Sequence, residues 1–405
     1  MKKLIALLLI AVLALSAAAC SSQPADTQAP AEGTEAAAPA DGAKVVKIGV
    51  FEPASGDNGA GGKQETLGVQ YANKVQPTVE IGGETYNVEL VIVDNESSND
   101  KAPTAAANLV AQNVSIVLGS YGSGVSIAAG DVFNKAGIPA MGITCTNPNV
   151  TAGNSYYFRI CFLDPFQGTV HANFAKEQLK ADTIYCLGEL GNDYDQGLIN
   201  YCKEAAEKLG IKVITESFPK DNSDFTSYLN NAKKAGAQAI FAPCSIQYAQ
   251  LIVEQSAAQG IDIPLLGSDT WDNNTIVGAT KGKDVQVYVS TFYQEGANPD
   301  FEKGIKEWIN GDAKNLENNG GNDMLAAVTV MGYDAYMVAI EALKAAGSTD
   351  AAAVMAALPN VTYTGISGSI AFNEIGDAIR DSAVIKKSNS ETGEWEFVAV
   401  QKAEA

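Results

Sequence analysis

The chain has 405 residues, of which 47 are acidic and 27 are lysine or arginine, giving a formal net charge of −20 at pH 7. This acidic balance argues against nucleic acid or an anionic lipid surface as a partner, because phosphate binding needs clustered lysine and arginine. Apolar residues make up 46% of the chain, enough for a core in each of the two domains that the length of the part after residue 43 predicts.

The first twenty residues predict export. Lys2 and Lys3 form a basic start, residues 4–15 are an apolar run, and small residues follow up to Cys20. This order is typical of a secretory signal peptide, which we expect to occupy residues 1–19. Cys20 resembles a lipoprotein processing site, at which the thiol is acylated and becomes the new N-terminus. The alternative is ordinary secretion with an incidental cysteine.

Residues 20–43 are interpreted as a lipidated flexible tether. From Ser21 to Gly42 the segment contains no valine, isoleucine, leucine or aromatic residue, so it cannot bury enough apolar surface to offset its ordering entropy. Two acyl chains at its start would anchor it stably. No later stretch approaches the length of a transmembrane helix. We therefore expect a protein on the extracytoplasmic face of the cell membrane, attached through the lipid anchor alone.

The next segments alternate between strands and helices. Strands are expected at 45–50, 88–93, 115–118 and 139–143, and helices at 63–74, 101–112 and 126–136. Glycine-rich loops at 52–62 and 119–124 separate some of them. Strands that alternate with helices of about a dozen residues predict a parallel sheet with helices on both faces.

The same rhythm starts again after residue 158. Helices are expected at 167–179, 196–209, 225–235 and 247–259, with strands at 183–187, 212–218, 239–242, 265–266 and 285–292. A helix-rich stretch that includes 326–345 follows, and residues 368–400 alternate apolar and polar positions around turns. The fold class is therefore α/β with two doubly wound parallel-sheet lobes. Lobe 1 is assigned residues 44–161 and 293–363, and lobe 2 residues 162–292 and 364–402.

The chain has few residues suited to metal binding. Five cysteines follow Cys20, none of them in a CxxC pair, and the odd number leaves at least one free thiol in an exported chain. We interpret them as small buried apolar residues; they are Cys145, Cys161, Cys186, Cys202 and Cys244. The single histidine, His171, cannot form a histidine cluster. No metal and no cofactor are expected.

Four motifs in order carry a family resemblance: residues 47–56 (KIGVFEPASG), 119–124 (GSYGSG), 192–194 (NDY) and 267–269 (GSD). From residue 44 onward the chain resembles the solute-binding subunits of branched-chain amino-acid ABC importers. The resemblance implies a type I periplasmic-binding-protein fold, in which two lobes joined by three crossovers trap a small ligand. It also implies a membrane permease as partner and a monomeric receptor.

The resemblance assigns the ligand's carboxylate to the first lobe. The family's serine falls at Ser123 and its threonine at Thr144 or Thr146, with backbone N–H groups assisting at Gly124. A helix follows this loop, and the free N–H groups and dipole of a helix N-terminus favour an anion. The alternative is that glycine- and serine-rich loops begin helices in any α/β protein.

The ligand's amino end is assigned to the second lobe. Tyr194 would cover the ligand on closing, and Asp269 would pair with its ammonium group, since opposite charges attract strongly in a partly dry site. Ser245 stands where the family often has tyrosine, and Tyr248 could substitute for it. The alternative for Asp269 is a helix N-cap. Further candidates are Trp271, which could line the cleft or merely pack, Gln64 and Tyr121.

These features predict a binding protein and not an enzyme. GxSxG, a Walker loop and metal-ligand spacings are all missing from the sequence. Arginine occurs only at 159 and 380, so capture of an anion by an arginine fork would need Arg159. The predicted function is capture of a small amino acid, most readily a branched-chain one, for delivery to the permease. Alternatives are an amide, urea-like or aromatic-acid cargo, a ligand sensor, or a secreted hydrolase.

Overall fold

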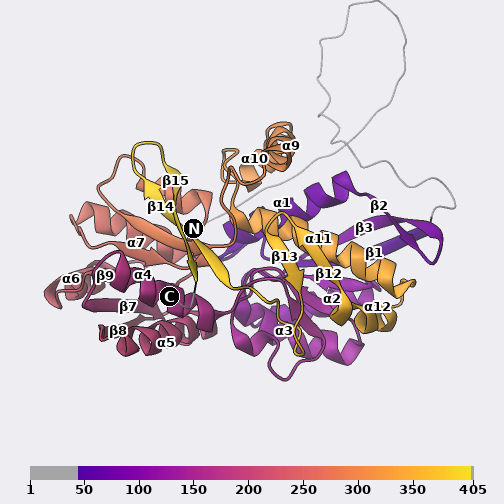
Figure 1. Cartoon of the computed structure of the whole chain (residues 1–405), viewed down its shortest axis with the longest axis horizontal. Helices are drawn as coiled ribbons and strands as arrows, with labels where there is room; N and C mark the ends of the chain where they lie inside the picture. The colour runs from indigo at the N-terminus through magenta and orange to yellow at the C-terminus, as the bar shows by residue number, and fades with distance from the viewer. Residues whose placement is uncertain (1–43, 403–405) are drawn as a thin grey trace, which may run out of the picture. The chain divides into compact units, whose positions relative to one another are not determined.

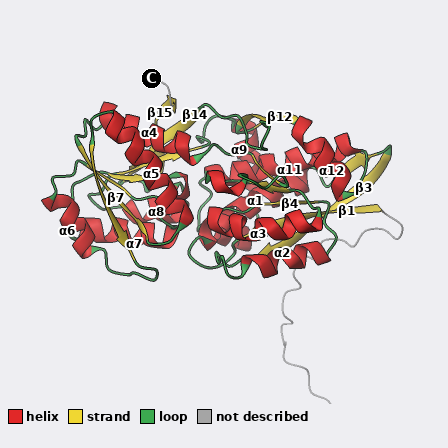
Figure 2. Cartoon of the chain, turned by 90° about the horizontal axis from the view of Figure 1, so that it is seen from below, coloured by secondary structure: helices red, strands yellow, loops and turns green. Residues whose placement is uncertain are grey.

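Two β-sheets, each covered by helices on both faces, organise the part of the chain that the computed structural model describes, residues 44–402. Figure 1 shows the sheet that contains β1 and the sheet that contains β7 in two separate halves of this part, and Figure 2 shows the helices that cover them. We call these halves the first and the second lobe. The predicted signal peptide and the whole predicted tether, with Cys20, lie outside the described residues.

The first lobe is built around a six-stranded sheet in the order β2-β3-β1-β4-β5-β6. Its strands are β1 (Lys44–Glu52), β2 (Thr78–Ile81), β3 (Glu84–Asp94), β4 (Ile116–Leu118), β5 (Ala140–Gly142) and β6 (Tyr157–Arg159). All neighbours pair in parallel except β2 and β3, which form an antiparallel hairpin. Gly82 and Gly83, both with positive φ, make its two-residue turn, which glycine adopts without strain.

Alternation along β1 explains how helices cover both faces of this sheet. Val46, Ile48 and Val50 belong to the core cluster that contains the buried residues of α1 (Gly59–Val75) and α11 (Ala327–Ala346). Phe51 belongs to the cluster of α2 (Ala102–Ala111) and α3 (Ser123–Ala136). Because successive side chains of a strand point to opposite faces, one short apolar strand contributes to both layers.

The second lobe repeats this build around a seven-stranded sheet in the order β15-β14-β11-β10-β9-β7-β8. Its strands are β7 (Thr183–Glu189), β8 (Lys212–Phe218), β9 (Ala239–Phe241), β10 (Leu265–Gly267), β11 (Val287–Thr291), β14 (Ser382–Asn389) and β15 (Glu394–Lys402). The helices are α4 (Asp164–Glu177), α5 (Asp193–Lys208), α6 (Thr226–Lys234), α7 (Ile246–Ala258) and α8 (Asn274–Thr280). Ile184 and Cys186 pack with α4 and α5, whereas Tyr185 and Leu187 pack with α6 and α7.

The chain passes between the two sheets three times: from β6 to α4, after β11, and from β13 (Gly368–Ala371) to β14. The three connections lie side by side. Phe162 of the first stacks on Phe292 of the second with ring centroids 4.2 Å apart, and Arg380 Nε of the third donates to the Ile160 carbonyl at 3.0 Å. The predicted fold class, two α/β lobes joined by three segments, is confirmed.

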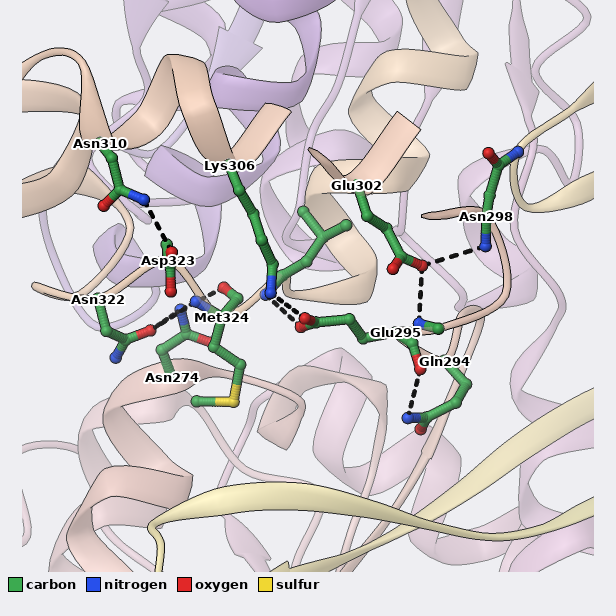
Figure 3. Close-up of polar contacts among 12 residues, drawn as sticks. Asn274, Gln294, Glu295, Asn298, Glu302, Lys306, Asn310, Asn322, Asp323 and Met324 are labelled. Carbon is green, nitrogen blue, oxygen red and sulfur yellow. Dashed lines mark hydrogen bonds and ion pairs between the residues drawn. The ribbon is translucent and has the colours of Figure 1, made fainter. Parts of the chain in front are cut away.

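A helical segment follows the second crossing and includes α9 (Pro299–Asn310) and α10 (Ala313–Asn318). Figure 3 shows how polar side chains fix it: Lys306 points toward Glu295, with which it forms an ion pair. Asn274 of α8 donates to the carbonyl groups of Asn319 and Met324 at 2.8 and 2.9 Å. The loop after α10 is therefore tied to the second lobe.

The remaining described elements are short: β12 (Thr362–Gly365), α12 (Ala351–Ala357) and the 3-10 turns η1 (Pro148–Val150), η2 (Asp269–Trp271) and η3 (Leu358–Asn360). None of the helices among residues 44–402 has the length and apolarity needed to cross a membrane. The sequence did not predict β2 and β6, whose TVEI and YFR lack the run of small and branched apolar residues that marks the equally short β4 (IVL). The helix predicted at 126–136 begins three residues earlier, at Ser123.

Candidate functional site

Five loops that follow parallel strands bring the predicted site residues other than Gln64, which lies on α1, to the facing edges of the two sheets. They follow β4 and β5 in the first lobe and β7, β9 and β10 in the second. In open α/β sheets this carboxyl edge is where ligands bind, since the strand ends leave a crevice there. The sequence predicted a site at these strand ends, and it remains a candidate site.

A cavity of about 240 Å³ lies between the loops. Pockets for drug-sized ligands usually span about 300–1,000 Å³, so this one suits a small solute. Both lobes contribute to it. First-lobe lining residues are Pro53, Asp57, Asn58, Ser97, Ser98, Asn99, Asp100, Tyr121, Gly122, Ser123, Gly124, Val125 and Thr144, and second-lobe ones are Glu189, Leu190, Gly191, Asn192, Tyr194, Lys220, Ser245 and Thr270.

The start of α3 forms one wall of the cavity. Gly122 is its N-cap and offers no side-chain cap, so the first-turn N–H groups have no partner within the helix. Ser123 is the first residue of α3 and does not precede the helix as the sequence suggested. Its Oγ accepts a hydrogen bond from the Asn147 N–H at 3.2 Å, which leaves the hydroxyl proton available to a ligand. This wall can receive a carboxylate.

Gly124 makes room for a neighbour. A Cβ at this position would lie 2.8 Å from Oδ1 of Asn99, another residue of the cavity wall. A larger residue here would displace the Asn99 amide from its present position.

The two threonines after β5 differ in position. Thr144 lines the cavity, and its Oγ1 donates to Oε1 of the buried Glu65 at 2.5 Å. Thr146 is fully buried outside the cavity lining, and its Oγ1 makes no well-formed hydrogen bond with another described residue. Of the two, Thr144 is the one that the closed cavity exposes to a ligand.

The second-lobe wall is organised by the cap of α5. The Asn192 side chain accepts from the N–H groups of Tyr194 and Asp195 at 3.1 and 3.3 Å, which fixes the first turn of the helix. The Tyr194 hydroxyl then donates to Oδ1 of Asp269 at 2.7 Å, and Gln167 Nε2 donates to the same oxygen at 2.6 Å. Tyr194 lines the cavity, whereas Asp269 lies behind it.

Asp269 is 3% exposed and is the first residue of η2, whose N-cap is Ser268. Its side chain therefore does not cap the turn, which removes the alternative reading of this residue. Burial raises the pKa of Asp269 to about 6, against the opposing effect of the hydrogen bonds from Gln167 and Tyr194. A neighbouring ammonium group would favour the ionised form.

Of three other second-lobe candidates, Tyr248 and Trp271 pack around the cavity and only Ser245 lines it. Tyr248 does not replace the family's tyrosine, because its ring packs edge-on against Phe218 with centroids 4.9 Å apart and its hydroxyl accepts from the Asp221 N–H. Ser245 itself lines the cavity. Trp271 is fully buried and donates from Nε1 to the Cys244 carbonyl at 3.0 Å, so it packs beneath the site.

Gln64 and Tyr121 connect the lobes. The Gln64 Oε1 accepts from Asn273 Nδ2 at 2.6 Å, and its Nε2 donates to Asn319 Oδ1 at 3.3 Å. Tyr121 lines the cavity and donates from its hydroxyl to the Thr270 carbonyl at 2.9 Å. Gln64 lies outside the cavity lining and holds the closed arrangement of the lobes.

Further bonds cross between the lobes. Asn147 Nδ2 donates to the Asp193 carbonyl at 2.9 Å, and the Ile246 N–H donates to Oδ1 of Asn58 at 3.3 Å. Together with the bonds of Gln64 and Tyr121, they describe lobes that are closed on each other.

Arg159 is not available to a ligand. It is fully buried, and its Nε pairs with Oδ1 of Asp377 at 2.5 Å. Its other nitrogens donate to the carbonyls of Cys145 and Asn147 and to the Thr151 hydroxyl. The guanidinium group therefore fastens the loop after β5 to the third crossing.

All five cysteines of the described residues are buried and free.

Sequence reasoning missed two buried polar residues at the start of α4. Asp164 and Gln167 are fully buried, and neither Asp164 oxygen nor the Gln167 Oε1 makes a well-formed hydrogen bond within residues 44–402. Burial raises the pKa of Asp164 to about 8, and the Asp269 charge adds to the effect. An acid before a proline at a helix start looks like an ordinary first-turn residue, so only burial distinguishes it.

Comparison with known proteins gives a consistent result. The sequence profile of the periplasmic binding protein family matches residues 45–390. The Leu/Ile/Val-binding protein homolog 1 of Brucella abortus (strain 2308) is 28% identical over 336 residues, which cover 82% of this chain and 87% of the relative. The leucine-, isoleucine-, valine-, threonine- and alanine-binding protein of Pseudomonas aeruginosa is 26% identical over 338 residues, 83% of this chain and 87% of the relative.

Comparison with solved structures gives the same result as the comparison of sequences. The leucine-binding protein LivK from Thermotoga maritima MSB8 is 31% identical with a TM-score of 0.78, over 88% of this chain and 99% of that one. The branched-chain amino acid transporter substrate-binding protein LivJ from Streptococcus pneumoniae, in complex with isoleucine, is 25% identical with a TM-score of 0.76, over 89% and 99%. A Rhodopseudomonas palustris solute-binding protein in complex with benzoate, 18% identical with a TM-score of 0.74 over 88% and 96%, shares the fold.

Proposed function

The chain belongs to the periplasmic binding protein family, and on this premise we propose that it captures a small amino acid between its two lobes, first among them leucine, isoleucine or valine. Members of this family are solute-binding proteins, and membership implies a location outside the cytoplasm. We further propose that the protein is a lipid-anchored monomer that delivers its ligand to the permease of an ABC importer.

The observation that carries the proposal is the composition of the two cavity walls. One wall presents the free N–H groups of α3 and the Ser123 hydroxyl, which suit a carboxylate. The other presents Tyr194 with Asp269 behind it, which suit an ammonium group. A zwitterion of amino-acid size satisfies both walls at once.

Lobe closure completes the site. We propose that the amino acid binds first to the wall at Ser123 and that the second lobe then closes, bringing Tyr194 over it. Asp269 would reach the ammonium group directly or after a small rotation of the Tyr194 ring, because Tyr194 now separates it from the cavity.

Isothermal titration of the purified protein with each of the twenty amino acids tests this function. Binding of at least one of leucine, isoleucine and valine supports it. Failure of all twenty would remove the amino-acid assignment.

One feature favours a second cargo class, an aromatic acid or amide. Ser245 lines the cavity with a small side chain where the resemblance expects tyrosine, which leaves room for a bulkier ligand. Titration with benzoate and with small amides in the same series separates the two classes.

A further inference from the structure

Two buried acids lie behind the first-lobe wall of the cavity. Glu52 ends β1 and is 1% exposed, and Glu65 lies on α1 and is fully buried. Neither forms an ion pair among the described residues. The deeply buried bases of this part of the chain serve other acids, since Arg159 pairs with Asp377 and Lys386 with Asp272. Isolated buried charges are costly, so this pair needs another source of stabilisation.

Each acid holds one ligand-facing loop through one oxygen. Oε2 of Glu52 accepts the backbone N–H of Tyr121 at 2.7 Å. Oε1 of Glu65 accepts the hydroxyl of Thr144 at 2.5 Å. Tyr121 belongs to the loop after β4 and Thr144 to the loop after β5, and both residues line the cavity. The two acids thus fix two of the loops that form the first-lobe wall.

The other oxygen of each acid has no hydrogen-bond partner among the remaining described residues. Oε1 of Glu52 and Oε2 of Glu65 are buried and bond no other described residue, while the two side chains lie within hydrogen-bonding distance of each other. Two ionised carboxylates at this distance would repel each other. A single proton between the two free oxygens would satisfy both.

The surroundings favour the protonated form. Burial raises the pKa of both acids above its ordinary value, and for Glu52 the Glu65 charge is the second cause. The other titratable groups that face the pair are acids as well, so none supplies a counter-charge: Cys145, Tyr121, Tyr157 and Asp269.

We propose that Glu52 and Glu65 share one proton at neutral pH and that this carboxyl–carboxylate pair positions the loops at Tyr121 and Thr144 for ligand capture. The two glutamates are positioning residues, since they act through the loops. The shared proton stands independently of any ligand, whereas its consequence for capture rests on the proposed function. Losing the proton leaves two adjacent charges, which loosens both loops.

Infrared spectroscopy in D₂O tests the shared proton in the purified protein. The wild-type spectrum at about pH 7 minus that of Glu65→Gln is expected to contain the carbonyl band of a protonated carboxylic acid, which titrates away toward about pH 9.5. In Glu65→Gln the amide can donate to Glu52 and accept from Thr144, so it keeps the hydrogen bonds without the proton. A difference spectrum that lacks the band overturns the proposal.

Hydrogen–deuterium exchange of the peptide that covers residues 119–124 tests the positioning role. In the wild type, protection is expected to fall at least tenfold, beyond the intrinsic pH effect, between about pH 7 and 9.5. In Glu65→Gln the peptide should stay protected from exchange at both pH values. In Glu65→Ala it should exchange rapidly at both. The exposed Glu204→Gln on α5 is the matched control and should follow the wild type.

Wild-type protection that does not change with pH, or a Glu65→Gln variant that loosens as the wild type does, overturns the positioning role. Both measurements are made without ligand. They therefore give a result even if no amino acid binds, and their failure is distinguishable from failure of the proposed function.

Discussion

The hydroxyl of Tyr194 donates a hydrogen bond of 2.7 Å to Oδ1 of Asp269, and this bond joins the two residues assigned to the ligand's amino end. Tyr194 comes from the first turn of α5 and Asp269 from the turn after β10, so the bond forms only in the folded second lobe. It orders the wall that a zwitterionic ligand would meet. It also screens the carboxylate from the cavity, which makes the contribution of each residue separable by substitution.

Asp269→Asn is expected to weaken binding of L-leucine by about 10- to 100-fold, the usual worth of a hydrogen bond to a charged group. The desamino analogue 4-methylpentanoate has no ammonium group, so its affinity should change little. Titration calorimetry of both ligands measures the difference, with the exposed Asp262→Asn as control. Equal losses for the two ligands would show that the carboxylate has only a structural role.

Ser123→Ala is expected to weaken the binding of L-leucine by roughly tenfold, because it removes a hydroxyl donor to the ligand's carboxylate. Leucinamide, which lacks the negative charge, should lose less. The control is Ser227→Ala, an exposed position of α6. If leucinamide loses as much as leucine does, the hydroxyl is not a carboxylate donor.

Gln64→Ala is expected to favour the open form, since it removes two buried bonds that hold the lobes together. All ligands should then lose affinity by a similar factor, on the order of tenfold, because closure is common to them. Small-angle scattering of the ligand-free protein should report a larger radius of gyration than for the control Gln112→Ala. A loss confined to one ligand would instead make Gln64 a direct contact.

The free energy of unfolding is expected to fall as pH rises from about 6.5 to 8.5. The pKa values of Glu65 and Asp164 are raised by burial to about 8, so the folded state binds more protons than the unfolded state in this window, and its advantage is lost as pH passes 8. Burial lowers the pKa of His171 to about 3, so the folded state binds fewer protons than the unfolded state between about pH 3 and 6.5. There His171 makes stability rise with pH, opposite to the carboxyl groups, but it has no such effect above pH 6.5.

Thermal denaturation measures this dependence. The melting temperature should drop by several degrees, at least about 3 °C, across the window. In Glu65→Gln the drop should be smaller, whereas Glu204→Gln should behave as the wild type. A melting temperature that rises toward pH 8.5 would contradict the assignment of protonated buried acids.

Cys20→Ser is expected to abolish incorporation of a palmitate analogue and to release the protein from the membrane fraction, because the thiol is the proposed acylation site. Metabolic labelling of expressing cells measures it, with Ser21→Ala as control. A Cys20→Ser protein that still labels and pellets with membranes would rule out lipidation at this residue.

Local patterns were sufficient to predict much of the fold. Val46, Ile48 and Val50 alternate with residues of the opposite face, and the loop at Gly119 follows a buried strand, so the repeated α/β pattern follows from short stretches of sequence. The three crossings between the lobes were an implication of the family resemblance. The short strands β2 (TVEI) and β6 (YFR) were missed because they lack a continuous aliphatic run such as that of β4 (IVL).

Residue roles that depend on distant partners could not be predicted in the same way. Gln64 bonds Asn273, 209 positions along the chain, and no periodicity reveals such a partner. Glu52, Glu65 and Asp164 stand out only through burial, since the chain contains 47 acidic residues of similar appearance in sequence. The sequence left open whether Trp271 lines the cleft or packs in the core. Its hydrogen bond to the Cys244 carbonyl shows that it packs.

A crystal structure of the protein grown with L-leucine measures the proposed capture most directly. The expected result is leucine in the cavity between the lobes, its carboxylate bonded to Ser123 and the first amides of α3, and its ammonium group on the side of Tyr194 and Asp269. An amino acid bound elsewhere, or bound in the cavity with its ammonium group against Ser123, would contradict the proposal.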